Sequence, residues 1–417
     1  MATTKEKFAW CLYDFANSSY TTIIVSIVYS VYFKEVVAAD TNGTRLWTWG
    51  YSGSMLIVAV ISPLLGAIAD FARLKKFFLI LFSYICIAAT ALLYFINKGD
   101  IVSGLLIFAV SNIAFNAAMT FYNSFLPDLT DKSSMGRLSG YAWALGYIGG
   151  LICLALISPF ISGEAASSKA SFHLVFPITA LFFLITSIPT FIILKERDGK
   201  NKKMNYFKEG FGRVRVTFHE IRRFKELTRY FIAYFIYTDA INTIIILTAI
   251  FAKVVLSFTM KDLVLYFIIV QISAALGGAI FGQITDRIGA KRTILITLVI
   301  WTAVVIAAYM VRTGFEFYII GFVAGVAIGS NQSSSRTLLA QMTPRAKSAE
   351  FFGFFSLVGK AAAVIGPILY GEIATRSGSH RLAVLSLSVF FIVGFILLLS
   401  VNEKAGIEAS EDYKNSG

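Results

Sequence analysis

Residues 282–292 read GQITDRIGAKR, and 216 residues earlier residues 66–76 read GAIADFARLKK. Each stretch follows a long apolar run, has a glycine on the last turn of that run and an acid four residues later, and ends in basic residues. The small-residue pairs Ser62/Gly66 and Gly278/Gly282 repeat at the same distance and predict close helix contacts there. A repeat of about half the chain length predicts two copies of one structural unit.

The chain that carries these copies has the composition of a membrane protein. Of its 417 residues, 57% are apolar and only 15% are charged, and its mean hydropathy is +0.73. Apolar runs of about 20 residues recur along it, each long enough to cross about 30 Å of hydrocarbon as a helix. The runs lack the alternation of barrel strands, so only helices satisfy their backbone groups in lipid. We predict an all-α membrane protein and exclude a soluble enzyme.

Twelve transmembrane helices are predicted, in two pseudo-symmetric halves of six. The predicted spans are approximately residues 9–36, 46–69, 77–97, 101–126, 138–161, 172–194, 230–252, 262–284, 293–312, 315–340, 350–373 and 380–401. The predicted units are an N-terminal half (1–194), a basic linker (195–229), a C-terminal half (230–402) and a tail (403–417).

The positive charge of the chain is unevenly divided between the two sides of the predicted membrane. The net charge is +13, and 26 of the 37 Lys and Arg lie in the tail, the linker and the loops on one side. The positive-inside rule places both termini in the cytoplasm, and we expect a bacterial inner-membrane location. Residues 195–229 are expected to contact anionic lipids of the inner leaflet. We expect no nucleic-acid partner, because the positive charge is spread over the loops and forms no single stripe. We also expect the protein to be a monomer.

A second repeat concerns polar residues inside the membrane. Residues 14–18 read DFANS and residues 239–243 read DAINT, so acid, amide and hydroxyl recur in the same order on one helix face. A third repeat places glycines six residues apart in the fifth and eleventh spans, at 140/146 and 353/359. Duplicated halves follow from all three repeats.

The loop at 282–292 resembles the G-x-x-x-D-R-x-G-x-K/R-R/K signature of the major facilitator superfamily. The loop at 66–76 is a weaker copy, in which Phe71 and Ala72 depart from the pattern. The resemblance extends over the whole chain. It implies the major facilitator fold, in which the first, fourth, seventh and tenth helices line a central cavity.

Three further stretches resemble a narrower group, the UMF1 family. They are residues 13–18 (YDFANS), residues 139–150 (SGYAWALGYIGG), and residues 332–336 (QSSSR) continuing to Pro344 and to residues 350–353 (EFFG). That family is related to the fungal vacuolar effluxers of the autophagy-related protein 22 type. The resemblance implies a secondary transporter, with amino acid efflux from the fungal vacuole as the best-known assignment.

Four formal charges lie in the interior of the predicted spans, more than three residues from either end, namely Asp14, Asp239, Arg336 and Lys360. A charge at membrane depth costs about 2.5–3.5 kcal/mol, so such residues pair with one another or face a wet cavity. Structural pairing is one interpretation, and a binding site is the other. The residues predicted to bind substrate or to couple ions are Asp14, Asn17, Tyr20, Asn112, Asn116, Tyr147, Asp239, Asn242, Gln332, Arg336 and Lys360.

Two roles are open for these charges. A zwitterion could place its ammonium near Asp239 and its carboxylate on the guanidinium fork of Arg336. The acids could instead carry protons, with H⁺ as the coupling ion and no other cofactor or metal. Asp239 is the favoured acid, because a span that begins at Tyr230 places it near the membrane midplane. A span that begins near Ala9 places Asp14 nearer to the membrane surface.

The signature loops predict a gate at the cytoplasmic side. Asp70 and Asp286 are each expected to face a helix N-terminus across the seam between the halves. The second copy is fuller, so Asp286 is predicted to matter more. The predicted gating residues are Gly66, Asp70, Arg73, Gly282, Asp286, Arg287, Gly289, Lys291 and Arg292.

The expected partner is a small polar solute, an amino acid or similar zwitterion, moved by alternating access. Two alternatives remain. Abundant phenylalanine would suit a lipid-like or amphipathic metabolite, and the linker could serve a non-transporting scaffold or sensor. The paired acids favour transport, because a scaffold gains nothing from their insertion cost. The glycine-rich stretch 146–150 lacks a following Gly-Lys-Ser/Thr, so it is not a phosphate loop and ATP-driven transport is not expected.

Overall fold

The computed structural model describes residues 2–39, 42–161, 172–196, 224–363 and 365–415. Within these ranges every regular element is helical. The α-helices are α1 (Thr4–Ser19), α2 (Tyr29–Tyr32), α3 (Gly43–Ala72), α4 (Lys75–Leu92), α5 (Ile101–Ser124), α6 (Leu126–Leu129), α7 (Met135–Ile161), α9 (Val175–Ile193), α11 (Lys225–Leu256), α12 (Met260–Ile288), α13 (Ala290–Met310), α14 (Gly314–Met342), α15 (Ser348–Ala361), α16 (Ile365–Ser377), α17 (His380–Ser386), α18 (Ser388–Leu399) and α19 (Glu403–Asn415). Two π-helical segments and three 3-10 turns join them, namely η1 (Tyr20–Ile27), η2 (Phe33–Val37), η3 (Leu93–Phe95), η4 (Lys132–Ser134) and η6 (Arg345–Lys347).

Twelve helical stretches of the described chain are long and apolar enough to cross a membrane. The first runs from Thr4 to Val37 and the last from His380 to Leu399. The predicted spans coincide with them, and the largest difference is at the fifth, which begins at residue 132 instead of 138. The predicted fold class, an all-α membrane protein of twelve helices, is confirmed.

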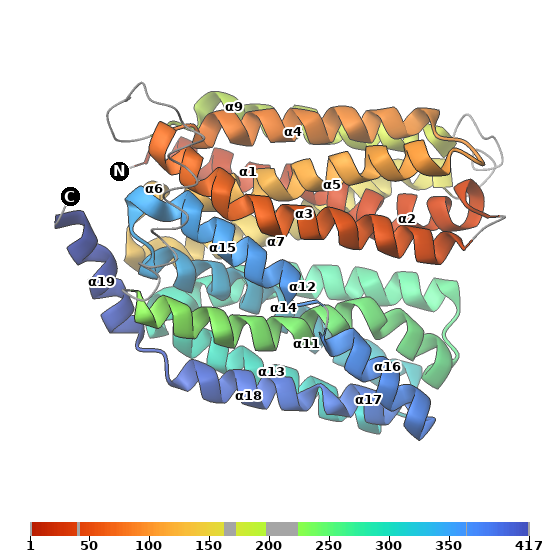
Figure 1. Cartoon of the computed structure of the whole chain (residues 1–417). Helices are drawn as coiled ribbons and strands as arrows, with labels where there is room; N and C mark the ends of the chain where they lie inside the picture. The colour runs from red at the N-terminus through yellow and green to blue at the C-terminus, as the bar shows by residue number, and fades with distance from the viewer. Residues whose placement is uncertain (1, 40–41, 162–171, 197–223, 364, 416–417) are drawn as a thin grey trace.

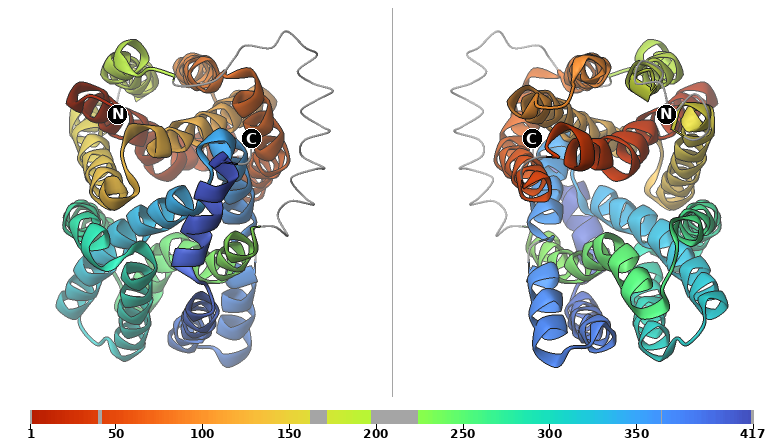
Figure 2. Two further views of the ribbon diagram at one scale, coloured as in Figure 1. Left: turned by 90° about the vertical axis from the view of Figure 1, so that its left-hand side faces the viewer. Right: turned by 90° about the vertical axis from the view of Figure 1, so that its right-hand side faces the viewer.

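The twelve spans form two bundles of six. Helices α1–α9 make one half and α11–α18 the other, and both chain ends lie at the same end of the molecule, here called the terminal end (Figure 1). The halves meet along two seams, where α3 packs against α15 and α7 packs against α12. Helix α19 lies across the terminal end, as the left view of Figure 2 shows.

Small residues bring the helices together at both seams. A methyl group added to Gly66 would overlap the carbonyl oxygen of Ala349, and one added to Gly353 would overlap that of Ser62. At the other seam, a methyl group on Gly140 would overlap the carbonyl oxygen of Gly278. The close helix contacts predicted from the small-residue pairs are therefore confirmed, and they join the two halves to each other.

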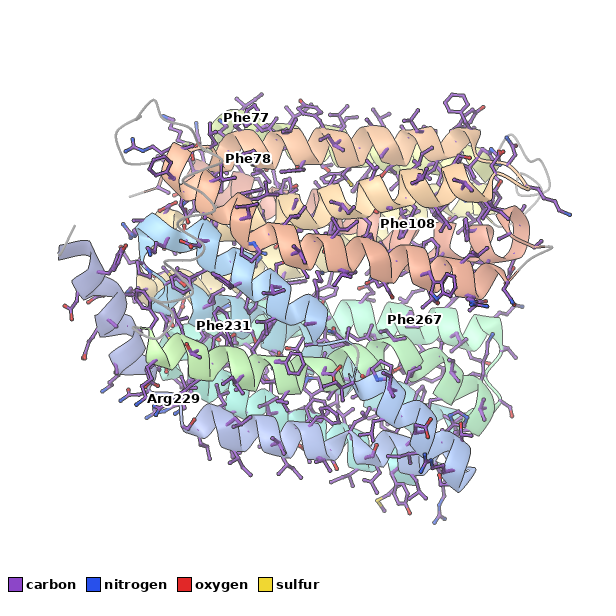
Figure 3. The ribbon with its side chains drawn as sticks, in the orientation of Figure 1. Phe77, Phe78, Phe108, Arg229, Phe231 and Phe267 are labelled. Carbon is purple, nitrogen blue, oxygen red and sulfur yellow. The ribbon has the colours of Figure 1, made fainter. Side chains whose placement is uncertain are left out.

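Apolar side chains cover the outside of the bundles, where lipid would lie. Phe77 is 54% exposed and points away from the helices, whereas Phe108 is fully buried inside the N-terminal half (Figure 3). Arg229 lies close to the terminal end, where it bonds Glu226 (2.7 Å) on its own helix (Figure 3). Threonine capping boxes begin three of the spans, with the pairs Thr3–Glu6, Thr259–Asp262 and Thr313–Glu316.

One predicted boundary needs correction, and one predicted segment contains a helix that was not expected. The linker was predicted over 195–229, but α11 already begins at Lys225, and residues 197–223 lie outside the described residues. The predicted tail contains α19, a helix that the apolar pattern did not indicate. It bonds to both halves at the terminal end, where Lys132 pairs with Glu411 (3.0 Å) and Ser410 donates to the carbonyl oxygen of Gln341 (3.2 Å).

Candidate functional site

Arg336 of α14 is the centre of a polar cluster between the halves. Its side chain is 2% exposed. Nε donates to Ser139 Oγ (2.8 Å) and Nη2 to the Ser139 carbonyl oxygen (2.7 Å), while Nη1 donates to Asp14 Oδ2 and to Asn123 Oδ1 (both 3.1 Å). All three partners belong to the N-terminal half. One arginine of the C-terminal half is thus held by three helices of the other half, namely α1, α5 and α7.

Aromatic rings surround the same guanidinium. Its Cζ lies 5.0 Å from the ring centre of Trp10, 5.3 Å from that of Trp143 and 5.8 Å from that of Tyr122. These distances are typical of cation–π attraction, which strengthens when the site excludes water. The planar cation is therefore held by bonds at its edge and by rings around it. In this conformation its fork is occupied by protein groups, so a substrate carboxylate could not take it.

Asp14 is neutralised within this cluster. Its Oδ2 accepts from Arg336, and its Oδ1 accepts from Asn17 Nδ2 (3.2 Å) on the same helix. The side chain is 3% exposed. A span that begins near residue 9 would place Asp14 close to the membrane surface. The span begins at Thr4 instead, so Asp14 lies about 15 Å along it.

Asp239, the equivalent acid of the second half, has other surroundings. It is fully buried, and its Oδ2 accepts from the backbone N–H of Gly366 (2.8 Å). Asn242 Nδ2 donates to the carbonyl oxygen of Ala362 (2.6 Å). Both partners flank the break in the eleventh span: Ala362 directly follows α15, and Gly366 is in the first turn of α16. The DAINT motif therefore holds a helix break within its own half.

The polar residues predicted on the fourth span are buried against neighbouring helices. Asn112 Nδ2 donates to Ser54 Oγ (2.7 Å) on α3, and Asn116 Nδ2 donates to the Asn112 carbonyl oxygen (2.7 Å). Tyr20 is fully buried, with its hydroxyl 2.8 Å from Ser111 Oγ on α5. The structure places these three side chains within the N-terminal half, where they have little surface to offer a solute in this conformation.

Three other predicted residues are half-buried near the seams. The Tyr147 hydroxyl donates to Gln332 Oε1 and so joins α7 to α14. Among the described residues, hydrogen bonds and ion pairs between the halves occur from this pair toward the terminal end, and none lies beyond it. Lys360, at the end of α15, makes no hydrogen bond or ion pair with the described part of the chain.

The two signature acids face each other's halves in matching positions. Asp286 accepts from the backbone N–H groups of Gly136 (2.8 Å) and Arg137 (3.1 Å), in the first turn of α7. Asp70 accepts from the backbone N–H of Glu350 (2.8 Å), in the first turn of α15. Each acid thus lies at a helix N-terminus across a seam, where the helix dipole favours a negative charge. This is the predicted placement, whereas the gating role stays a prediction.

The remaining gate residues differ in their contacts. Lys291 Nζ donates to the carbonyl oxygens of Leu399 (2.9 Å) and Val401 (2.6 Å). Gly289 has φ +95, a conformation that favours glycine, and ends α12. The side chains of Arg73, Arg287 and Arg292 make no hydrogen bond or ion pair with the residues that the structure describes, and their gating role stays a prediction.

Several residues of the cluster were not predicted from sequence. Ser139 and Trp143 lie in the stretch 139–150, which was used for family resemblance only, and Asn123 and Trp10 carried no motif of their own. Lys75 was also missed, although it pairs with Asp70 (3.2 Å) and lies in the quoted loop. Lys75 could have been predicted, because both signature loops have basic residues shortly after the acid. No local pattern indicated the other four.

Comparison with known families supports the architecture. Residues 40–411 match the model of the family described as "Vacuole effluxer Atg22 like". The "Uncharacterized MFS-type transporter YxiO" of Bacillus subtilis is 31% identical over 98% of this chain and 97% of its own length. Autophagy-related protein 22 of Yarrowia lipolytica is 26% identical over 89% of this chain and 77% of its own length.

Solved structures of major facilitator transporters share the fold. The human organic anion transporter MFSD10 superposes with a TM-score of 0.74 at 13% identity, over 94% of this chain and 99% of that one. The transporter FucP in the outward conformation superposes with a TM-score of 0.72 at 12% identity, over 95% of this chain and 98% of that one. The chain therefore belongs to the Atg22-like vacuole effluxer family and is a transporter of the major facilitator type.

Proposed function

We propose that the protein is a secondary active transporter that moves an amino acid or a similar small zwitterion by alternating access coupled to protons. The observation that carries the proposal is the distribution of polar contacts between the halves. Among the described residues these contacts extend from the terminal end to the Tyr147–Gln332 pair and stop there. Two halves joined by polar contacts at one end can rock about a central site.

The charge distribution supports a cytoplasmic position for the terminal end. Lys75, Lys132 and Lys291 are bound there by acids or carbonyl groups, and most of the Lys and Arg of the chain lie in loops on that side. Basic residues accumulate in short cytoplasmic loops. On this orientation, the present conformation is closed toward the cytoplasm.

Asp14 is the acid that we assign to proton coupling. Its carboxylate is the only acidic partner of Arg336 within the described chain, and the bond crosses between the halves. Protonation of Asp14 would remove the charge that holds the cation, so it would weaken the closed end. Asp239 bonds a backbone group of its own half, and its protonation would not act on the seam. The sequence favoured Asp239 because of its predicted depth and the neighbouring Asn242 and Thr243.

Lys360 is the cation that we assign to the solute carboxylate in this conformation. The pairs Gly66–Ala349 and Ser62–Gly353 set an antiparallel register between α3 and α15. In that register Lys360, two turns beyond Gly353, is at the level of residue 55 of α3, which is also the level of the bonded Ser54–Asn112 pair. Its half-buried ammonium, without a partner among the described residues, suits a carboxylate better than the occupied Arg336 does.

Transport by the purified full chain in proteoliposomes tests the proposal. We expect a labelled amino acid to accumulate when a pH gradient is imposed and to exchange between equal pools without one. Asp14→Asn should lose gradient-driven accumulation and keep exchange, whereas Lys360→Gln should lose both. Asp239→Asn serves as the comparison for Asp14→Asn. If no amino acid enters above the level of protein-free liposomes, with or without a gradient, the proposed substrate class is wrong.

A further inference from the structure

A groove of about 530 Å³ lies on the outer surface of the N-terminal half, between α1 and α7. It begins at the terminal end and is separate from the Arg336 cluster. At its mouth are Thr4, Lys7, Thr130, Ser134 and Arg137, and its walls are formed by Phe8, Leu138, Tyr141, Leu145 and Ile148, among others.

The groove changes from polar to apolar along its length. Arg137 is in the first turn of α7, and Ile148 lies about 16 Å farther along that helix. The spans of α1 and α7 begin at Thr4 and Lys132, so the polar mouth is at the membrane boundary and the apolar walls are at hydrocarbon depth. Tyr141 and Ile148 are each 41% exposed, so the walls are open to the membrane. This order matches a headgroup followed by an acyl chain.

The mouth carries positive charge without an ionic partner. Lys7 Nζ donates to Thr130 Oγ1 (3.3 Å), and neither Lys7 nor Arg137 forms an ion pair with the described residues. Arg137 interacts electrostatically with Asp286, but both oxygens of that carboxylate already accept backbone N–H groups of α7. Two cations and three hydroxyl groups at one mouth are therefore available to phosphate oxygens.

We propose that this groove binds one anionic phospholipid. Its phosphate would lie between Lys7 and Arg137, and one acyl chain would follow Leu145 and Ile148 into the membrane. The charge of the mouth selects an anionic headgroup over a zwitterionic one, and the walls require a chain and not a free anion. The proposal does not depend on the transported solute.

Native mass spectrometry of the full chain in a delipidating detergent tests this site. Phosphatidylglycerol, phosphatidylcholine and inorganic phosphate are added separately, and the bound fraction is measured for each. We expect phosphatidylglycerol to bind about tenfold more tightly than phosphatidylcholine, and the variant Lys7→Gln/Arg137→Gln to lose that preference. The matched control Arg345→Gln/Lys404→Gln, at the same end but outside the groove, should keep it.

A second variant tests the walls without changing charge. Ile148→Trp fills the deep part of the groove from an exposed position, so it should weaken both lipids and leave the unfolding temperature of the lipid-free protein unchanged. Equal binding of the two lipids to the wild type would overturn the proposal, and so would full competition by inorganic phosphate. If Lys7→Gln/Arg137→Gln does not fold, the proposal is tested by the lipid preference of the wild type and by the binding of both lipids to Ile148→Trp.

Discussion

Asp14 and Asp239 occupy the same position in two copies of one motif, yet they have different partners. Asp14 pairs with Arg336 across the two halves, whereas Asp239 accepts a backbone N–H from Gly366 in its own half. The difference lies in the neighbouring helix. On one side α7 is continuous and packs its Gly149 on the backbone of Phe15; on the other, the eleventh span is broken between α15 and α16.

The break decides what each acid can do. A continuous helix satisfies its own backbone, so α7 leaves Asp14 free to pair with an arginine. A broken helix exposes N–H and carbonyl groups that must find partners when buried, and Asp239 and Asn242 supply them at Gly366 and Ala362. A duplicated motif therefore gives a contact between halves in one copy and a structural support in the other.

The largest expected effect comes from removing Arg336. Arg336→Gln leaves the buried carboxylate of Asp14 without its cation and should cost about 3–5 kcal/mol of stability, because an unpaired charge is strongly unfavourable there. Arg336→Lys keeps the charge but loses the bonds to Ser139 and the packing of the planar guanidinium against the aromatic rings. We therefore expect this variant to transport at less than about a tenth of the wild-type rate. Thermal unfolding in detergent and solute uptake measure the two effects.

The double variant Asp14→Asn/Arg336→Gln isolates the pair. Because it leaves no unpaired charge, it should recover part of the stability that Arg336→Gln loses, without recovering transport. An equal loss of stability in the single and double variants would show that the Asp14–Arg336 pair is not the interaction that matters.

Asp239→Asn should have a smaller and more local effect. The amide oxygen can still accept from Gly366, so we expect faster hydrogen exchange at residues 361–363 and 365–366 and little change at the terminal end. A cysteine pair at Tyr141 and Gln283, whose side chains meet across the seam at 3.4 Å, reports closure of that end by crosslinking. The native Cys11, Cys86 and Cys153 are buried and should not interfere. If Asp239→Asn reduces this crosslink as much as Asp14→Asn does, the two acids share one role after all.

Asp70 and Asp286 extend the comparison to the seams, and their contacts lead us to expect the opposite order of effects from the one predicted from sequence. The side chain of Asp70 is 2% exposed and pairs with Lys75, which also contacts Asp128 and Ser348. Asp286 accepts two backbone N–H groups and forms no ion pair with the described residues. We expect Asp70→Asn to cost about 1–3 kcal/mol and Asp286→Asn about 1 kcal/mol. The crosslink at residues 141 and 283 and thermal unfolding should both rank them in this order; the reverse order would restore the sequence-based expectation.

The fold followed from the sequence because its determinants are local. Length and hydropathy set each span, and the repeats of small residues, such as Gly66 and Gly282, marked the helix faces that meet at the seams. Helix α19 was missed because it is polar, and its stability depends on contacts such as Lys132–Glu411 between residues far apart in the chain.

The site followed only in part. Burial cost singled out Asp14, Asp239 and Arg336, but it did not say which charges pair, because that depends on how two halves dock. The break beside Gly366 could not be foreseen from the residues that bond to it. Trp10 and Trp143 looked like ordinary membrane aromatics, and only their distances to Arg336 distinguish them.

The smallest expected effect is at the last polar contact between the halves. Tyr147→Phe removes the hydroxyl that donates to Gln332 and leaves the ring in place, so it should cost about 1 kcal/mol or less, because Gln332 is half-buried and water can replace the bond. If this pair marks where the halves separate, the variant should raise the rate of opening at the terminal end severalfold and leave the crosslinked fraction at equilibrium nearly unchanged. Tyr84→Phe, on the exposed face of α4, is the control, because that hydroxyl makes no hydrogen bond with the described residues, and it should have no effect on that rate. A Tyr147→Phe protein with the wild-type opening rate would place the division between the halves elsewhere along α7.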